Sequence, residues 1–165
     1  LAKTRLDAAI RGSADDPPPS DWPAPDCILL ADVLEHLVDP WSVLSTWVSR
    51  LAPGGCVIVS LPNVTHWSLV SGLARGRFDY LDEGILDRTH LRFFTRETAA
   101  AMLRGAGLEI EEHHRVVALA PSLIGELGRV VLRREKAGRR LGRVQQRLAD
   151  LCSYQLVFRA RPTGS

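Results

Sequence analysis

The chain has 165 residues, of which 45% are hydrophobic and 24% charged, and its formal net charge is +2. This composition is typical of one globular domain, and the small net charge excludes a surface built throughout for nucleic acid or membrane. Three widely spaced cysteines, Cys27, Cys56 and Cys152, argue against a disulfide framework and predict a reducing, cytoplasmic setting. No apolar run approaches the ~18 residues of a membrane-spanning helix.

The first predicted elements form a strand–helix–strand unit. A strand is expected over 26–33 and a second over 56–62, and neither shows alternation of apolar and polar residues. Such runs are typical of strands buried on both faces of a parallel sheet. Between them lies a predicted helix over 41–52, with Asp39 as its N-cap and Pro40 at its first position. The unit has the size of a βαβ crossover.

The rest of the chain continues the same alternation of strands and helices. After an irregular stretch at 63–94, the predicted elements are a helix over 95–107 capped by Thr95, a strand over 108–119, a basic helix over 122–151 and a last strand over 152–162. This order predicts an α/β fold with a mostly parallel sheet and flanking helices. We expect one domain, with its core in residues 5–120.

Polar side chains follow both strands of the first unit where each strand ends. The apolar run of the first strand stops at Asp32, and Glu35 and His36 come within four residues of it; Asn63 follows the second strand. Ligands bind beyond the carboxyl ends of the strands in such sheets, so these side chains are candidates for a functional cleft. Two structural roles remain open: the acids can cap the strand end and the next helix, and Asn63 can turn the chain.

Four segments together resemble a known family. They are "DCILLADVLEHLVDP", "LAPGGCVIVSLPN", "GLARGRFDYLDEGILDRTHLRFFT" and "AGLEI". In this order and spacing they look like the second half of a class I methyltransferase that uses S-adenosylmethionine, of a subgroup acting on small molecules or cell-surface sugars. The resemblance covers residues 5–112 and implies a Rossmann-like fold, S-adenosylmethionine as cofactor, and a small-molecule or saccharide acceptor.

The chain departs from the family at its beginning. The family opens with a strand and a glycine-rich turn that approaches the cofactor, and neither is found in this sequence, which begins at Leu1. We therefore expect a methyltransferase domain truncated in its N-terminal half, the C-terminal two-thirds of the full enzyme. An alternative is a non-catalytic subunit or remnant of this fold that pairs with another chain, including a second copy of itself.

The resemblance also implies roles for particular residues. The cofactor would contact Ser13, Ala14, Ala31, Asp32 and Glu35, with Ser13 standing where the family often has an acid. Imidazole titrates near neutral pH, so His36 is the first candidate for a general base, followed by Asp87 and His90. The substrate would contact Asn63 and Arg88. The structural alternatives are a His36 packed under a loop, and an ion pair of Asp87 with Arg92 beside phenylalanines in the core.

No metal site and no nucleic-acid partner are expected. His113 and His114 are adjacent, so on a strand they point to opposite faces and cannot share an ion. Residues 129–147 carry eight lysines and arginines against one acid. This basic stretch is either a solvated helix face or a surface for acidic lipid or polyanionic glycan; nucleic acid is the least favoured partner, because aromatic residues do not interleave with the charges.

Overall fold

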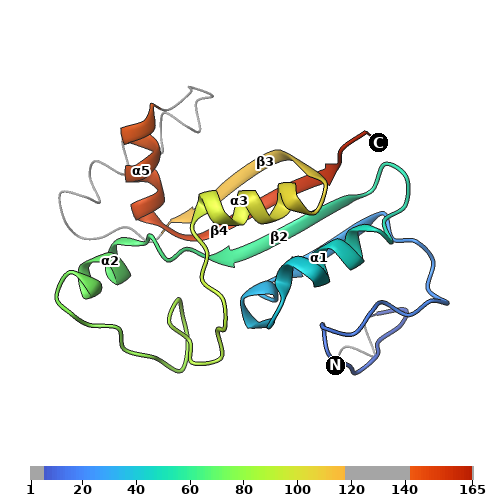
Figure 1. The fold of residues 1–165 in the computed structure, drawn as a ribbon, viewed down its shortest axis with the longest axis horizontal. Coiled ribbons are helices and arrows are strands. Elements are labelled where there is room, and N and C mark those ends of the chain that lie inside the picture. The colour runs from blue at the N-terminus through green and yellow to red at the C-terminus, as the bar shows by residue number, and fades with distance from the viewer. Residues whose placement is uncertain (1–5, 118–141, 165) are drawn as a thin grey trace.

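The computed structural model describes residues 6–117 and 142–164 (Figure 1). Its elements are, in order, β1 (Cys27–Ala31), the short 3-10 helix η2 (Leu34–His36), α1 (Pro40–Val48), β2 (Cys56–Pro62), α2 (Trp67–Leu73), α3 (Arg96–Gly105), β3 (Leu108–Val117), α5 (Arg143–Cys152) and β4 (Ser153–Pro162). None of the described helices is long and apolar enough to cross a bilayer.

The described strands form one sheet in the order β1-β2-β4-β3. β1 and β2 run parallel, whereas β4 is antiparallel to both β2 and β3. The predicted α/β class is confirmed, and the described part of the sheet is mixed rather than mostly parallel. Of the helix predicted over 122–151, the structure describes α5, and the remainder lies outside the described residues, as does most of the basic stretch.

Local capping signals explain where two helices begin. Asp39 accepts a hydrogen bond from the backbone N–H of Ser42 at 3.1 Å, and Pro40 occupies the first turn of α1. Thr95 accepts from the backbone N–H of Thr98 at 3.2 Å at the start of α3. Each cap satisfies an N–H that has no partner inside the helix, so both predicted starts are confirmed. α2 was not predicted, because its 7 residues are too few to show a helical period.

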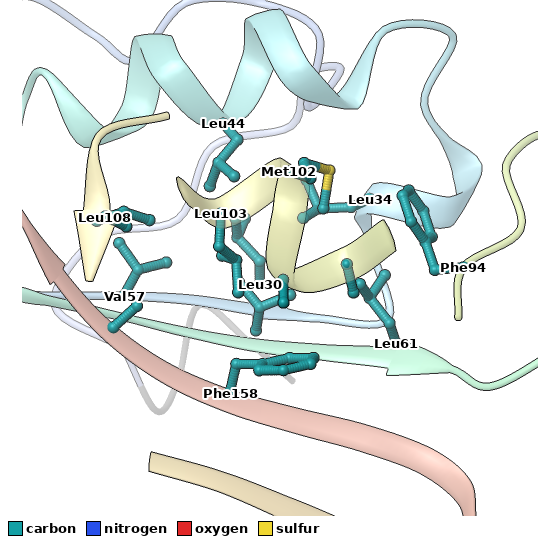
Figure 2. Packing of buried hydrophobic residues seen from close by; sticks show 14 of the residues in the cluster. Leu30, Leu34, Leu44, Val57, Leu61, Phe94, Met102, Leu103, Leu108 and Phe158 are labelled. Carbon is teal, nitrogen blue, oxygen red and sulfur yellow. The ribbon is translucent and has the colours of Figure 1, made fainter. Parts of the chain in front are cut away.

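The core lies between one face of the sheet and the helices α1 and α3, which cover the same face (Figure 1). Figure 2 shows Leu44 of α1 and Leu103 of α3 above Val57, Leu61 and Phe158 of the sheet. Each of these five side chains is at most 2% exposed. Apolar area removed from water at this interface fixes the ends of β1 and β2, and hence the place of the residues that follow them.

The other face of β1 is open within the described residues. Burial alternates along this strand, and Leu29 is 64% exposed. No described strand pairs with the outer edge of β1. The prediction that this strand is buried on both faces is therefore wrong for the described part of the chain, because a continuous apolar run cannot reveal which neighbours are present to cover it.

His113 predicts how stability should change with pH. Its ring lies 4.8 Å from that of Phe158, and burial, with Arg115, Arg96 and His114 nearby, lowers the pKa of His113 to about 3. A buried neutral imidazole resists protonation, so its stabilising contribution is complete above the ordinary pKa of 6.5 and is lost as the pH falls below it. We expect the unfolding free energy of the wild type to fall between pH 7 and pH 5. In His113→Phe this fall should be smaller by roughly 1–2 kcal/mol.

The measurement is urea unfolding across that pH range. His114→Gln is the matched control, since the side chain of His114 is 68% exposed and its removal should change the pH dependence far less than His113→Phe does. An equal pH dependence in wild type and His113→Phe would contradict the prediction.

Candidate active site

Asp32 lies at the sheet edge where β1 ends. Its Oδ1 accepts hydrogen bonds from Ser60 Oγ at 3.0 Å and from Gln155 Nε2 at 2.6 Å. Its backbone φ is +52°, in the left-handed region that few residues other than glycine, asparagine and aspartate occupy. Two neighbouring strands thus hold an exposed carboxylate in a fixed place at the end of the sheet.

Glu35 is a buried acid on η2. The residue is 1% exposed, and within the described residues neither of its carboxylate oxygens has a hydrogen-bond partner. Burial raises the pKa of Glu35 to about 7, and the negative charge of nearby Asp32 adds to this effect. A buried carboxyl group without a partner is costly to keep, which marks this position as a candidate functional group.

A distant loop is held against η2 by the backbone carbonyl of Glu35. This oxygen accepts from the N–H groups of Leu91 at 2.8 Å and Arg92 at 3.0 Å. Arg92 Nε donates to the carbonyl of Val38 at 3.0 Å. The side chain of Arg92 therefore does not form the ion pair with Asp87 that was the structural alternative for this segment. These contacts bring the 84–94 loop to the end of β1.

Asp87 orients His36 through Thr89. The hydroxyl of Thr89 donates to Asp87 Oδ1 at 2.6 Å, and the backbone N–H of Thr89 donates to the same oxygen at 2.7 Å. These hydrogen bonds lower the pKa of Asp87. His36 Nδ1 lies 3.2 Å from the carbonyl oxygen of Thr89 and 3.1 Å from its hydroxyl oxygen. A carbonyl only accepts, so Nδ1 carries the proton and Nε2 the lone pair.

His90 is buried beside His36. Their ring centroids lie 4.7 Å apart in an edge-to-face arrangement. His90 Nδ1 lies 3.0 Å from the carbonyl oxygen of Ile85, which again places the proton on Nδ1 and the lone pair on Nε2. One potential ligand atom from each of Glu35, His36 and His90 lies within 4.8 Å of the other two. Three predicted site residues thus form one cluster, which we call the Glu35–His36–His90 cluster.

The cluster borders an open pocket of about 280 Å³. The residues that line this pocket are Asp32, Glu35, Pro62, Gly84, His90, Tyr154 and Gln155. Gly84 has a φ of +90°, and a Cβ at this position would lie 2.6 Å from the hydroxyl oxygen of Tyr154. The positive φ therefore favours glycine at this position, and the absence of a side chain leaves room for the Tyr154 hydroxyl.

Two predicted substrate contacts lie apart from the cluster. Asn63 is fully buried, and its amide donates to the carbonyls of Asp150 at 2.7 Å and Ser153 at 2.8 Å. Its side-chain amide thus links the end of β2 to α5 and β4 inside the fold. Arg88 is exposed and pairs with Asp82 at 2.8 Å. Substrate contact by either residue stays a prediction that this geometry does not favour.

Some residues at the pocket were missed by sequence reasoning. Gln155 and Tyr154 reach it because β4 is antiparallel to β2, with Gln155 opposite Pro62. Thr89 is missed because its role depends on the contact between the loop and His36. A hydroxyl two residues after an aspartate is too common a pattern to signal such a relay by itself.

The remaining predicted cofactor contacts lie on the other side of β1. Ala14 helps to line an apolar pocket of about 380 Å³ with Leu30, Val33 and Trp47 among its other walls. Ser13 is exposed, and its polar groups are used locally: its hydroxyl donates to Asp15 at 3.2 Å and its backbone N–H to Asp16 at 3.1 Å. Ala31 is exposed at the end of β1.

Comparison with known protein families shows the class to which the chain belongs. A family model described as a methyltransferase domain matches residues 5–113, more than half of the chain. The chain therefore belongs to the methyltransferase-domain family, whose class I members use S-adenosylmethionine as cofactor, and the predicted resemblance to class I methyltransferases is confirmed.

One curated relative matches part of the sequence, and solved structures share the fold. The tRNA 5-carboxymethoxyuridine methyltransferase of Escherichia coli is 42% identical over 60 residues, 36% of this chain and 23% of that protein. The chain thus matches less than a quarter of that relative's length. The CcbJ methyltransferase from Streptomyces caelestis has a TM-score of 0.55 at 14% identity, covering 93% of this chain and 62% of that one. A methyltransferase from Thermotoga maritima described as SAM-dependent has a TM-score of 0.54 at 18% identity, covering 92% and 62%.

The described residues fit one side of a cofactor site. The exposed Asp32 carboxylate suits an ammonium or hydroxyl group, and the apolar pocket beside Ala14, Leu30 and Trp47 suits a flat base. These two features lie on either side of the end of β1, where Ala31 is exposed. The fit concerns this side of the site alone.

Proposed function

We propose that this chain forms the acceptor side of an S-adenosylmethionine-dependent methyltransferase that modifies a hydroxyl group of a small molecule or saccharide. The observation that carries the proposal is the chain of hydrogen bonds from Asp87 through Thr89 to His36, which lies at the carboxyl end of β1. Because Nδ1 of His36 faces Thr89, Nε2 on the other side of the ring is left with its lone pair free.

Methyl transfer asks the protein mainly for alignment and exclusion of water. When bound, S-adenosylmethionine supplies a methyl group whose bond to sulfur breaks, the electron pair going to sulfur, as the acceptor oxygen bonds to the methyl carbon. His36 Nε2 takes the proton that the hydroxyl loses. Thr89 and Asp87 are positioning residues, because they hold the imidazole in the tautomer that leaves Nε2 basic.

The relative named for tRNA makes nucleic acid a competing acceptor. We favour a small acceptor because the pocket beside Asp32 and Glu35 is about 280 Å³, close to the lower end of the roughly 300–1,000 Å³ typical of small-ligand sites. An assay with radiolabelled methyl donor should therefore compare hydroxylated small molecules and saccharides with bulk tRNA. Transfer to tRNA alone would overturn the choice of acceptor and leave methyl transfer intact.

Asp32→Asn tests whether this edge holds the cofactor. Asparagine tolerates a positive φ, so the backbone should be preserved while the negative charge is lost. We expect calorimetry to show roughly tenfold to hundredfold weaker binding of S-adenosylmethionine, since hydrogen bonds to charged groups contribute about 1.5–3 kcal/mol.

The control is Asp79→Asn, which removes an exposed carboxylate from the pair with Arg77 and should leave the affinity unchanged. No binding by the wild-type chain at millimolar cofactor would contradict catalysis by this polypeptide on its own. Equal affinity in Asp32→Asn and wild type would contradict the role of Asp32.

A second candidate function is a non-catalytic subunit that shares its sheet with another chain. The observation in its favour is the outer edge of β1, which no described strand pairs, beside the exposed Leu29. This candidate predicts a dimer by light scattering, and Leu29→Lys should make it monomeric. A wild-type monomer that methylates an acceptor would exclude this candidate.

A further inference from the structure

The Glu35–His36–His90 cluster has the composition of a metal site. Two imidazoles and one carboxylate form a common ligand set for divalent transition metals, and at least one further position remains for water or substrate. One potential ligand atom from each residue lies within 4.8 Å of the others. The sequence gives no sign of this set, because His90 comes from a loop far along the chain from η2.

We propose that Glu35, His36 and His90 bind one divalent transition-metal ion at the border of the pocket below the end of β1. A tetrahedral ion with bonds of about 2.1 Å holds its ligand atoms roughly 3.4 Å apart. The side chains must therefore close by small rotations, which the exposed His36 ring can make.

The buried carboxylate is the first independent support. Glu35 is 1% exposed and borders the pocket, yet neither of its oxygens has a hydrogen-bond partner within the described residues. Buried charges are normally paired or bound to metals, because an isolated carboxylate loses its hydration without compensation. A cation at the cluster would supply the missing partner for both oxygens.

The two imidazoles are the second support, because both are prepared as ligands. His36 Nδ1 faces the Thr89 carbonyl oxygen at 3.2 Å, and His90 Nδ1 faces the Ile85 carbonyl oxygen at 3.0 Å. Metal-binding histidines typically donate one ring N–H to a carbonyl or carboxylate and present the lone pair of the other nitrogen. Both rings here have that arrangement.

The position of the site suggests what a bound ion would do. Asp32, Tyr154 and Gln155 line the same pocket, so an acceptor oxygen in it would lie next to the ion. A cation lowers the pKa of a hydroxyl that it contacts, and a site with a metal would thus prefer acceptors with a coordinating oxygen. With the ion bound, the Nε2 lone pair of His36 would be coordinated, so activation of the acceptor hydroxyl would fall to the ion, and His36 would act as the base only in the metal-free enzyme. This consequence rests on the proposed methyl transfer, whereas binding of the ion does not.

The test is direct binding of Co²⁺ to the full chain, purified without a histidine tag and stripped with a chelator. We expect calorimetry to give one ion per chain, and His36→Gln and His90→Gln each to weaken the affinity at least tenfold. His114→Gln should bind as wild type does, since His114 is exposed and outside the cluster. Glu35→Gln should also lose affinity if circular dichroism shows it folded.

The cysteines need their own control, because Cys27 and Cys56 are neighbours across β1 and β2. The double variant Cys27→Ser/Cys56→Ser should retain the site. Binding that survives in both His36→Gln and His90→Gln, or that disappears only in the cysteine variant, would overturn the proposal, as would a stoichiometry far below one. Metal binding without methyl transfer would leave this site standing and refute the proposed function.

Discussion

Replacing His36 with glutamine is expected to lower the rate of methyl transfer to a hydroxylated acceptor about 10²–10⁴-fold, the usual contribution of a positioned general base. Glutamine keeps a polar side chain of similar reach but cannot take a proton at neutral pH. Because His36 is exposed, the substitution should leave the fold and the affinity for S-adenosylmethionine unchanged. The loss should therefore be in kcat, measured with saturating cofactor in a radiolabelled transfer assay.

Two further variants separate a catalytic role from a structural one. Thr89→Val removes the hydroxyl that links His36 to Asp87 and should lower kcat less than His36→Gln does. It should also shift the pH–rate profile, which mere loss of structure would not do. His114→Gln is the matched control, and a rate in His36→Gln equal to that of the control would refute the assignment.

Asp150→Ala is expected to lower the free energy of unfolding by about 3–5 kcal/mol, which is the usual effect of removing one partner from a buried ion pair. The Asp150 carboxylate accepts from Arg96 Nε at 3.1 Å and pairs with the Arg115 guanidinium at 3.0 Å. The side chains of Asp150 and Arg115 are only 8% and 4% exposed. Without the carboxylate, the contacts that fix α5 to α3 and β3 are lost while the Arg115 guanidinium stays buried.

Urea unfolding followed by circular dichroism measures this effect. The matched control is Asp79→Asn in the exposed pair of Arg77 and Asp79, where the side chains are 70% and 60% exposed. Exposed pairs contribute about 0–1 kcal/mol, so this variant should unfold almost as wild type does. A loss below 1 kcal/mol for Asp150→Ala would show that the arginines find other partners.

The sequence predicted well the features that depend on nearby residues. Asp39 with Pro40 and the cap at Thr95 are signals read within a few residues, and both helices begin where these signals lie. The strand ends were also predictable, because an apolar run that stops at Asp32 marks the sheet edge. Asp32, Glu35 and His36 are consequently placed at one end of β1, as predicted.

Features that depend on long-range contacts were less accessible. Gln155 reaches Asp32 only through the antiparallel register of β4 against β2, and no pattern near position 155 encodes that register. The encounter of His90 with His36 depends in turn on two N–H groups that donate to the Glu35 carbonyl. The open face of β1 has the same cause, since burial depends on neighbours that an apolar run does not specify.

The backbone of Asp32 sets two selection pressures on one position. A left-handed non-glycine residue carries strain of about 1–3 kcal/mol, which glycine would relieve and a β-branched residue would worsen. In a saturation library, a screen for thermal resistance should therefore enrich glycine and asparagine at position 32, whereas a screen for turnover should return aspartate. A disagreement between the two screens at this one codon would separate what the fold tolerates from what the chemistry requires.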